Sequence, residues 1–196
     1  MKKRLLIILT LVMLLVLAVQ PAAAKTILAN FTGTDGADDY EGSSKSEVIR
    51  GLGGNDDLSG EGGNDTISGG NGADLIDGGS GNDSLSGNNG KDKLNGDGGA
   101  DTINGGNGND LIFGDSGNDY IQGGDGKDKI RGGSGNDTIY GDAGNDWLLG
   151  NDGNDRIYAG PGTDYVDGGP GYDVCHVGTG DKKVSACEVI YRYANQ

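Results

Sequence analysis

Gly105-Gly106-Asn107-Gly108-Asn109-Asp110-Leu111-Ile112-Phe113 is one copy of the unit from which most of this 196-residue chain is built. The same pattern, Gly-Gly-x-Gly-x-Asp-x-U-x with U apolar, runs from Gly33 to His176 without an insertion or deletion, so 144 residues form 16 units. A flexible linker has no reason to keep such a register. In a solenoid, a slip of one residue would turn every later side chain to the wrong face. The constant spacing therefore predicts a solenoid.

Each position of the unit has its own expected role. Residues seven to nine are predicted to form a short strand, with the eighth facing inward and its neighbours facing outward. Residues one to six are predicted to form a turn, in which glycine permits positive φ and lets carbonyl groups crowd around one point. The eighth residues are Tyr40, Ile49, Leu58, Ile67, Ile76, Leu85, Leu94, Ile103, Ile112, Ile121, Ile130, Ile139, Leu148, Ile157, Val166 and Cys175.

The sixth position points to a metal. It is Asp in 15 units and Glu47 in the other, so every turn carries a carboxylate. Stacked turns would bring these carboxylates to about the 4.8 Å strand spacing, a repulsive arrangement unless cations lie between them. The turns contain no His or Cys, and carboxylate and carbonyl oxygens favour Ca²⁺ over zinc or copper. We therefore expect calcium in the turns.

The unit resembles the hemolysin-type calcium-binding (RTX) nonapeptide repeat over residues 33–176. The resemblance implies an all-β parallel β-roll of about eight coils, each of two nonapeptides, with calcium in the turns between coils. It implies roughly a dozen Ca²⁺ ions, with turn carbonyls near Gly72 and Gly108 among the ligands. The side-chain ligands that it implies are Asp38, Asp56, Asp65, Asp74, Asp83, Asp92, Asp101, Asp110, Asp119, Asp128, Asp137, Asp146, Asp155, Asp164 and Asp173.

The second unit, residues 42–50, departs most from the pattern. It has Lys45 at the fourth position and Glu47 at the sixth. We expect its calcium site to be incomplete and the unit to act as an N-terminal cap. Residues 25–32, in which Ile27, Ala29 and Phe31 alternate, are predicted to form a leader strand that covers the same end of the roll.

Residues 1–24 have the features of a secretory signal peptide. A basic start at positions 2–4 precedes an apolar stretch over 5–19, and small residues with an Ala-x-Ala pattern end at Ala24. The alternative, a transmembrane anchor, is disfavoured because the apolar stretch is shorter than the roughly 20 residues of a span. We therefore expect a secreted or cell-surface protein without stable membrane insertion after cleavage.

The charge of the chain limits its partners. Cleavage would remove Lys2, Lys3 and Arg4, which takes the formal net charge from −15 to −18. Such acidity argues against nucleic acid and anionic membranes as partners. The periodic placement of the carboxylates instead indicates cation sites.

Cys175 and Cys187 are the two cysteines of the chain. An exported chain meets an oxidising environment, so we expect a disulfide that fastens residues 177–196 over the end of the roll as a C-terminal cap. Cys187, Val189, Tyr191 and Tyr193 alternate as in one strand. A catalytic thiol beside His176 is disfavoured, because neighbouring strand residues point to opposite faces.

No motif of a known enzyme class appears in the sequence, and a single His excludes a multi-histidine zinc site. We expect the metal-free chain, charged and poor in apolar residues, to be disordered and to fold on calcium binding. Two functions are consistent with the pattern: an extracellular structural or binding module, and an accessory to a polysaccharide-modifying or other secreted enzyme.

The outward positions are candidates for a surface that binds a glycan or a cell-envelope protein, although strand propensity alone would also place apolar and aromatic residues there. Ice binding is disfavoured, because no unit has Thr at its third position. Alternate units should share a face, and their apolar and cationic side chains fall into two sets. One comprises Leu75, Lys93, Leu111, Phe113, Lys129, Arg131, Trp147, Leu149 and Tyr165, and the other comprises Tyr120, Tyr140 and Tyr158.

Overall fold

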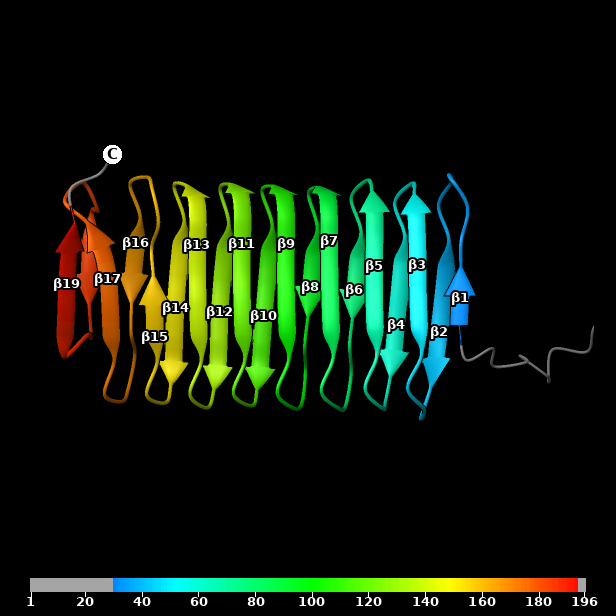
Figure 1. Cartoon of the computed structure of the whole chain (residues 1–196), viewed down its shortest axis with the longest axis horizontal. Helices are drawn as coiled ribbons and strands as arrows, with labels where there is room; N and C mark the ends of the chain where they lie inside the picture. Colours follow the sequence, from blue (N-terminus) through cyan, green and yellow to red (C-terminus); the bar gives the residue numbers. More distant parts are fainter. Residues whose placement is uncertain (1–29, 194–196) are drawn as a thin grey trace, which may run out of the picture.

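The computed structural model describes residues 30–193, which form a parallel β-solenoid of about nine turns (Figure 1). The predicted signal peptide and most of the predicted leader strand lie outside the described residues. Odd-numbered strands form one sheet and even-numbered strands form the other, and the two sets run in opposite directions. None of the described residues belongs to a helix that could span a membrane. The predicted fold class is confirmed.

The strands follow the order of the nonapeptides, and the 16 units supply β2 to β17. The ten-stranded sheet contains β1 (Asn30–Thr32), β3 (Val48–Gly53), β5 (Thr66–Asn71), β7 (Ser84–Gly90), β9 (Thr102–Gly108), β11 (Tyr120–Gly126), β13 (Thr138–Gly144), β15 (Arg156–Tyr158), β17 (Val174–Gly178) and β19 (Val189–Tyr193). The nine-stranded sheet contains β2 (Asp39–Ser43), β4 (Asp57–Glu61), β6 (Leu75–Asp77), β8 (Lys93–Asn95), β10 (Leu111–Ser116), β12 (Lys129–Ser134), β14 (Trp147–Asp152), β16 (Tyr165–Asp167) and β18 (Lys183–Ser185).

The register confirms that one coil is two nonapeptides. Ile112 pairs with Ile130 in one sheet and Ile121 pairs with Ile139 in the other, each 18 residues apart. The eighth-position residues from Ile49 to Cys175 are at most 2% exposed and form the core between the sheets. Each of the strands β3 to β17 therefore contributes its eighth-position side chain to the core.

Several strands are longer than the three residues that the pattern predicted. β9, for example, runs through the first four turn positions to Gly108. The reason is that parallel hydrogen bonding continues between stacked turns, as in the pairing of Gly106 with Gly124 and Gly108 with Gly126. The turns are thus part of the sheet edges and not separate loops.

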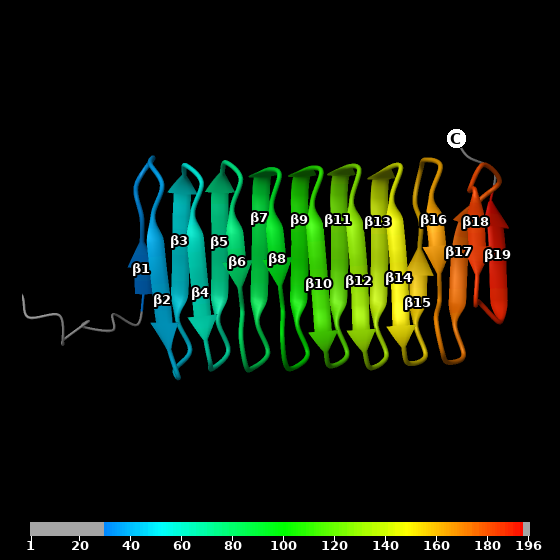
Figure 2. The same cartoon turned by 180° about the vertical axis from the view of Figure 1, so that it is seen from behind.

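The C-terminal tail corrects one expectation. Cys175 and Cys187 form the predicted disulfide, with a Cα–Cα distance of 6.0 Å. The predicted strand from Cys187 to Tyr193 begins only at Val189, as β19, because the tail continues the solenoid path through a further strand, β18, and a turn (Figure 2). Cys187 lies in the turn between these two strands. The cap is also held by Tyr193, whose hydroxyl accepts a hydrogen bond from the Gly160 N–H at 2.9 Å.

Candidate calcium-binding turns

The sixth-position carboxylates form two columns along the edges of the solenoid, because successive coils repeat every 18 residues. In each column the backbone N–H of one residue donates to Oδ1 of the equivalent residue in the next coil. The Asp92 N–H donates to Asp110 at 2.8 Å, and the Asp110 N–H donates to Asp128 at 2.8 Å. This repeated hydrogen bond fixes the direction of the carboxylates from Asp56 on.

The second oxygen of these carboxylates has no donor. Oδ2 is buried and without a hydrogen-bond partner in all 14 units from residue 51 on, and the side chains are at most 3% exposed. A buried polar atom is expected to have a partner, and a buried charge even more so. These residues are Asp56, Asp65, Asp74, Asp83, Asp92, Asp101, Asp110, Asp119, Asp128, Asp137, Asp146, Asp155, Asp164 and Asp173.

Backbone oxygens lie beside the unpartnered carboxylate oxygens. A methyl group placed on Gly96, a first-position residue, would lie 2.5 Å from Oδ2 of Asp101 and 2.9 Å from the carbonyl oxygen of Gly114 in the next coil. A methyl group placed on Gly105 would likewise lie next to Oδ2 of Asp110 and a carbonyl oxygen of the next coil. A carboxylate oxygen of one coil and a carbonyl oxygen of the next therefore lie near each other beside the first-position glycine, and both are of the hard oxygen type that Ca²⁺ prefers.

The fourth-position carbonyls named by the sequence also lie between coils. The carbonyl oxygens of Gly72 and Gly108 point at the fourth-position residues of the next coil, Gly90 and Gly126, where a Cβ would collide with them. Gly90 and Gly126 have φ of 146° and 143°, which a residue with a side chain rarely adopts. Glycine is needed here for both conformation and space.

The turns lack a side-chain cluster that could hold a metal by itself. Within residues 30–193, no group of three or more His, Cys, Asp or Glu side chains has the arrangement of a metal site. The sixth position contributes one carboxylate to each turn, so carbonyl oxygens would have to complete a coordination shell. Such a mixed oxygen set suits Ca²⁺, which takes six to eight oxygen ligands in flexible geometry.

Burial makes the charged form of these carboxylates unfavourable in the absence of a cation. Desolvation raises the pKa of Asp101 and of Asp137 to about 7, although each accepts a backbone hydrogen bond that opposes the rise. The neighbouring carboxylates in the column raise both pKa values further. A divalent cation between coils would offset both effects.

The first two units have a different arrangement. Asp38 Oδ2 accepts the Thr34 N–H at 2.6 Å, and Glu47 Oε2 accepts the Ser43 N–H at 3.0 Å. The hydroxyl groups of Thr34 and Ser43 donate to the same carboxylates. Oδ2 of Asp38 and both carboxylate oxygens of Glu47 therefore have protein donors.

Sequence reasoning missed the role of the fifth position. Asn109 Oδ1 accepts the backbone N–H of Lys127 in the next coil at 2.8 Å, and Asn136 Oδ1 likewise accepts the Asn154 N–H at 2.8 Å. The frequent Asn at this position was visible in the sequence, but its partner 18 residues later could be identified only with the coil geometry. These bonds hold successive turns together outside the carboxylate columns.

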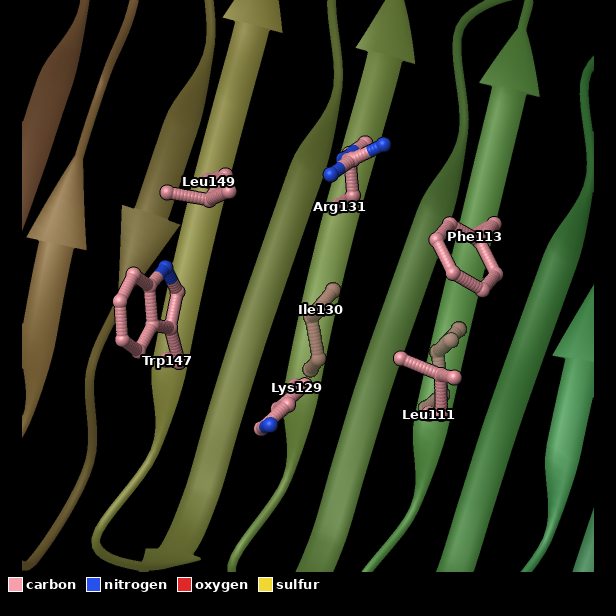
Figure 3. A pocket seen from close by; sticks show the side chains of 8 residues that line it. Leu111, Phe113, Lys129, Ile130, Arg131, Trp147 and Leu149 are labelled. Atoms are coloured by element: carbon pink, nitrogen blue, oxygen red, sulfur yellow. The ribbon is translucent and has the colours of Figure 1, made fainter.

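The nine-stranded sheet carries the predicted mixed surface. Leu111 and Phe113 on β10, Lys129 and Arg131 on β12, and Trp147 and Leu149 on β14 border a shallow hollow of about 240 Å³ (Figure 3). We call these six residues the cationic–aromatic surface. The Arg131 guanidinium lies 5.6 Å from the centre of the Phe113 ring, and Trp147 is 47% exposed.

The aromatic residues of the ten-stranded sheet pack on one another. The rings of Tyr140 and Tyr158 are stacked at 4.6 Å, Tyr158 and His176 at 4.4 Å, and His176 and Tyr191 at 4.7 Å. Because these ring faces cover each other, the column joins the cap to the roll. It offers a ligand fewer free ring faces than isolated aromatic residues would.

Comparison with known proteins agrees with the geometry. The model of the RTX calcium-binding nonapeptide repeat (4 copies) matches residues 32–67, 50–85, 68–103, 86–121, 104–139, 113–148 and 140–175. A search of curated proteins found no match. The matches span residues 32–175 and coincide with the repeated turns and their carboxylate columns. The chain therefore belongs to the RTX calcium-binding nonapeptide repeat family.

Proposed function

We propose that the chain is an exported module that folds when Ca²⁺ fills its turns and then serves outside the cell as a structural or binding element. The observation that carries this proposal is the set of buried carboxylate oxygens without donors. Without a cation they are desolvated like charges, so the metal-free roll is unfavourable. Calcium supplies the countercharge and cross-links consecutive coils. Export from the calcium-poor cytosol would then trigger folding.

The proposed side-chain ligands are the 14 aspartates whose Oδ2 lacks a donor, from Asp56 to Asp173. Carbonyl groups of the turns, among them those of Gly72 and Gly108, complete the shell. Asp38 is also a ligand predicted from the sequence. Because its carboxylate already accepts hydrogen bonds from Thr34, it is the weakest of the candidate calcium ligands. We expect roughly a dozen ions per chain, because sites need a coil on each side.

Circular dichroism and native mass spectrometry test this function together. The metal-free protein should be disordered, and Ca²⁺ should induce a β-sheet spectrum as ions bind. Mg²⁺ should substitute poorly, because it requires a near-ideal octahedron and loses its waters reluctantly. A strand spectrum that persists in excess chelator, or binding of three or fewer Ca²⁺ ions, would contradict the proposal.

The cationic–aromatic surface favours a second candidate function. In a chain of net charge −15, Lys129 and Arg131 lie between apolar and aromatic side chains on one face. Ring faces stack on sugars, and cations pair with carboxylates. This chemistry fits an acidic polysaccharide and would make the module an accessory to an enzyme that acts on such a polymer.

Affinity electrophoresis through a gel that contains polygalacturonate, at fixed Ca²⁺, tests this candidate. The double variant Lys129→Gln/Arg131→Gln should migrate with much less retardation than the unmodified protein. Lys127→Gln is the matched control, because it removes an exposed cation from a turn and should keep the retardation. Equal retardation of all three proteins would exclude this surface, and an envelope protein would then be the better partner to seek.

A further inference from the structure

The last nonapeptide, residues 168–176, has no nonapeptide above it, yet its turn is covered by a carbonyl group. A methyl group on Gly168 would meet Oδ2 of Asp173 at 2.5 Å and would collide with the carbonyl oxygen of Ala186. One coil earlier, the same space at Gly150 is bordered by Oδ2 of Asp155 and the carbonyl oxygen of Gly168. The Ala186 carbonyl therefore occupies the place of a first-position carbonyl in the next coil.

A carboxylate of the cap continues the column as well. The Asp155 N–H donates to Asp173 Oδ1 at 2.8 Å, and the Asp173 N–H donates in turn to Glu188 Oε2 at 2.6 Å. Glu188 follows Asp173 by 15 residues and not by 18, because the turn between β18 and β19 is short. The additional methylene of glutamate lets its carboxylate reach the place that an aspartate occupies elsewhere.

Two further features make this turn similar to the interior ones. Oδ2 of Asp173 is buried without a partner, and Asp173 is 0% exposed. The Val189 N–H donates to the Asp173 carbonyl at 3.1 Å, as the Val174 N–H donates to the Asp155 carbonyl at 2.9 Å one coil earlier. The cap turn thus presents an unpaired buried carboxylate oxygen, a converging carbonyl and a second carboxylate.

We propose that Asp173, the Ala186 carbonyl and Glu188 form a Ca²⁺ site beyond the last nonapeptide. This inference rests on the proposed calcium binding of the interior turns. The Cys175–Cys187 disulfide positions the site, because Cys187 lies between Ala186 and Glu188, and Cys175 follows Asp173 by two residues. The disulfide therefore holds ligands from both sides of the site in place.

Asp181 ends the other carboxylate column, and its hydrogen bonds differ from those of Glu188. Its Oδ1 accepts the Asp164 N–H at 3.1 Å, as Glu188 accepts the N–H of Asp173. Its Oδ2, however, accepts the Gly178 N–H at 2.6 Å. Both oxygens of Asp181 are thus engaged by backbone donors, unlike those of Asp173. We assign Asp181 a structural capping role.

Native mass spectrometry of the calcium-loaded protein can test the assignment, because it counts bound ions one at a time. Glu188→Gln keeps the size of the side chain and an oxygen acceptor for the Asp173 N–H but removes the charge. It should bind one Ca²⁺ ion fewer than the unmodified protein at the same free Ca²⁺. Asp181→Asn is the control and should bind the full number.

The disulfide provides an independent measurement. Calcium should slow reduction of Cys175–Cys187 by a thiol reagent, and Glu188→Gln should lose most of this protection while Asp181→Asn keeps it. A full ion count and full protection in Glu188→Gln, or an equal loss in both variants, would overturn the cap site. If the unmodified protein bound no calcium, the proposed function itself would be wrong.

Discussion

The turns of the first two nonapeptides and the 14 that follow differ in one backbone feature. From Leu52 on, every second-position residue has a positive φ, whether it is Gly or a residue such as Asn88, at 73°. Thr34 and Ser43, the second residues of the first two units, do not belong to this set, and their N–H groups donate to the sixth-position carboxylates. A left-handed second position therefore coincides with a carboxylate oxygen that is free for a cation. The carboxylate is paired with protein donors in the first kind of turn, and in the second kind we propose that a cation takes their place.

The largest expected difference between the two regions concerns the core. Ile112→Asp places an unpaired charge at a site with 0% exposure, and several kcal/mol of destabilisation should prevent folding at any Ca²⁺ concentration. Tyr40→Asp changes the equivalent position of the first unit, which is only partly buried. The calcium-induced β-sheet spectrum of the other coils should therefore be unchanged in this variant. Circular dichroism during a Ca²⁺ titration distinguishes them. Leu111→Asp, on the outer face, is the control for the charge itself, and a loss of folding there would contradict the inward–outward alternation.

The next effect concerns the carboxylates directly. Asp110→Asn removes a proposed ligand and should raise the Ca²⁺ concentration at the folding midpoint on the order of tenfold, equivalent to about 1.4 kcal/mol. Asp38→Asn changes a carboxylate that Thr34 already satisfies, so its midpoint should shift much less. Equal shifts in the two variants would remove the distinction between metal-closed and hydrogen-bonded turns.

Acidification should partly replace calcium in the later turns. Burial raises the pKa of Asp101, Asp137 and Asp146 to about 7 in the folded chain, above the unfolded value near 4. The folded state therefore binds more protons than the unfolded state, and its stability increases as pH falls from above 7 towards 4. Metal-free protein should gain strand signal over this range. A flat signal between pH 8 and pH 4 would contradict the expected desolvation.

The smallest effect concerns the hydrogen bonds of the fifth position. Asn109→Ala leaves the Lys127 N–H without its partner and should cost about 1 kcal/mol, seen as a modest rise in the calcium midpoint. Asn109→Ser is the matched control, because Ser46 in the second unit already accepts the Asn64 N–H at 2.9 Å. If the serine variant raised the calcium midpoint as much as the alanine variant does, this hydrogen bond would depend on the longer side chain of asparagine.

The sequence predicted what depends on the nine-residue period alone. The inward line from Ile49 to Cys175 followed from the spacing, the two-nonapeptide coil from the family resemblance and the disulfide from the expected export, and the structure confirms all three features. It missed features that depend on how turns stack. Neither the left-handed Leu52 nor the Asn109 bond to the next coil has a local sequence signal.

The cap shows the same limit more clearly. Glu188 lies outside the nonapeptide pattern, 15 residues after Asp173, so counting by nine or 18 could not find it. Its position follows from the short turn between β18 and β19 and from the pairing of Val174 with Val189. Only the path of the chain through both sheets identifies it.

The alternation of units between two sheets has a consequence for how such a chain can change length. Insertion or loss of a single nonapeptide would move every later unit to the opposite sheet. If the change fell between Tyr140 and Trp147, for example, Trp147 would join the face of Tyr140, and the cationic–aromatic surface would be split between two sides of the molecule. A pair of nonapeptides, by contrast, adds or removes one whole coil and leaves both faces intact. A solenoid of this kind can therefore gain or lose coils and keep the residues of each face together only when the change is a multiple of two nonapeptides.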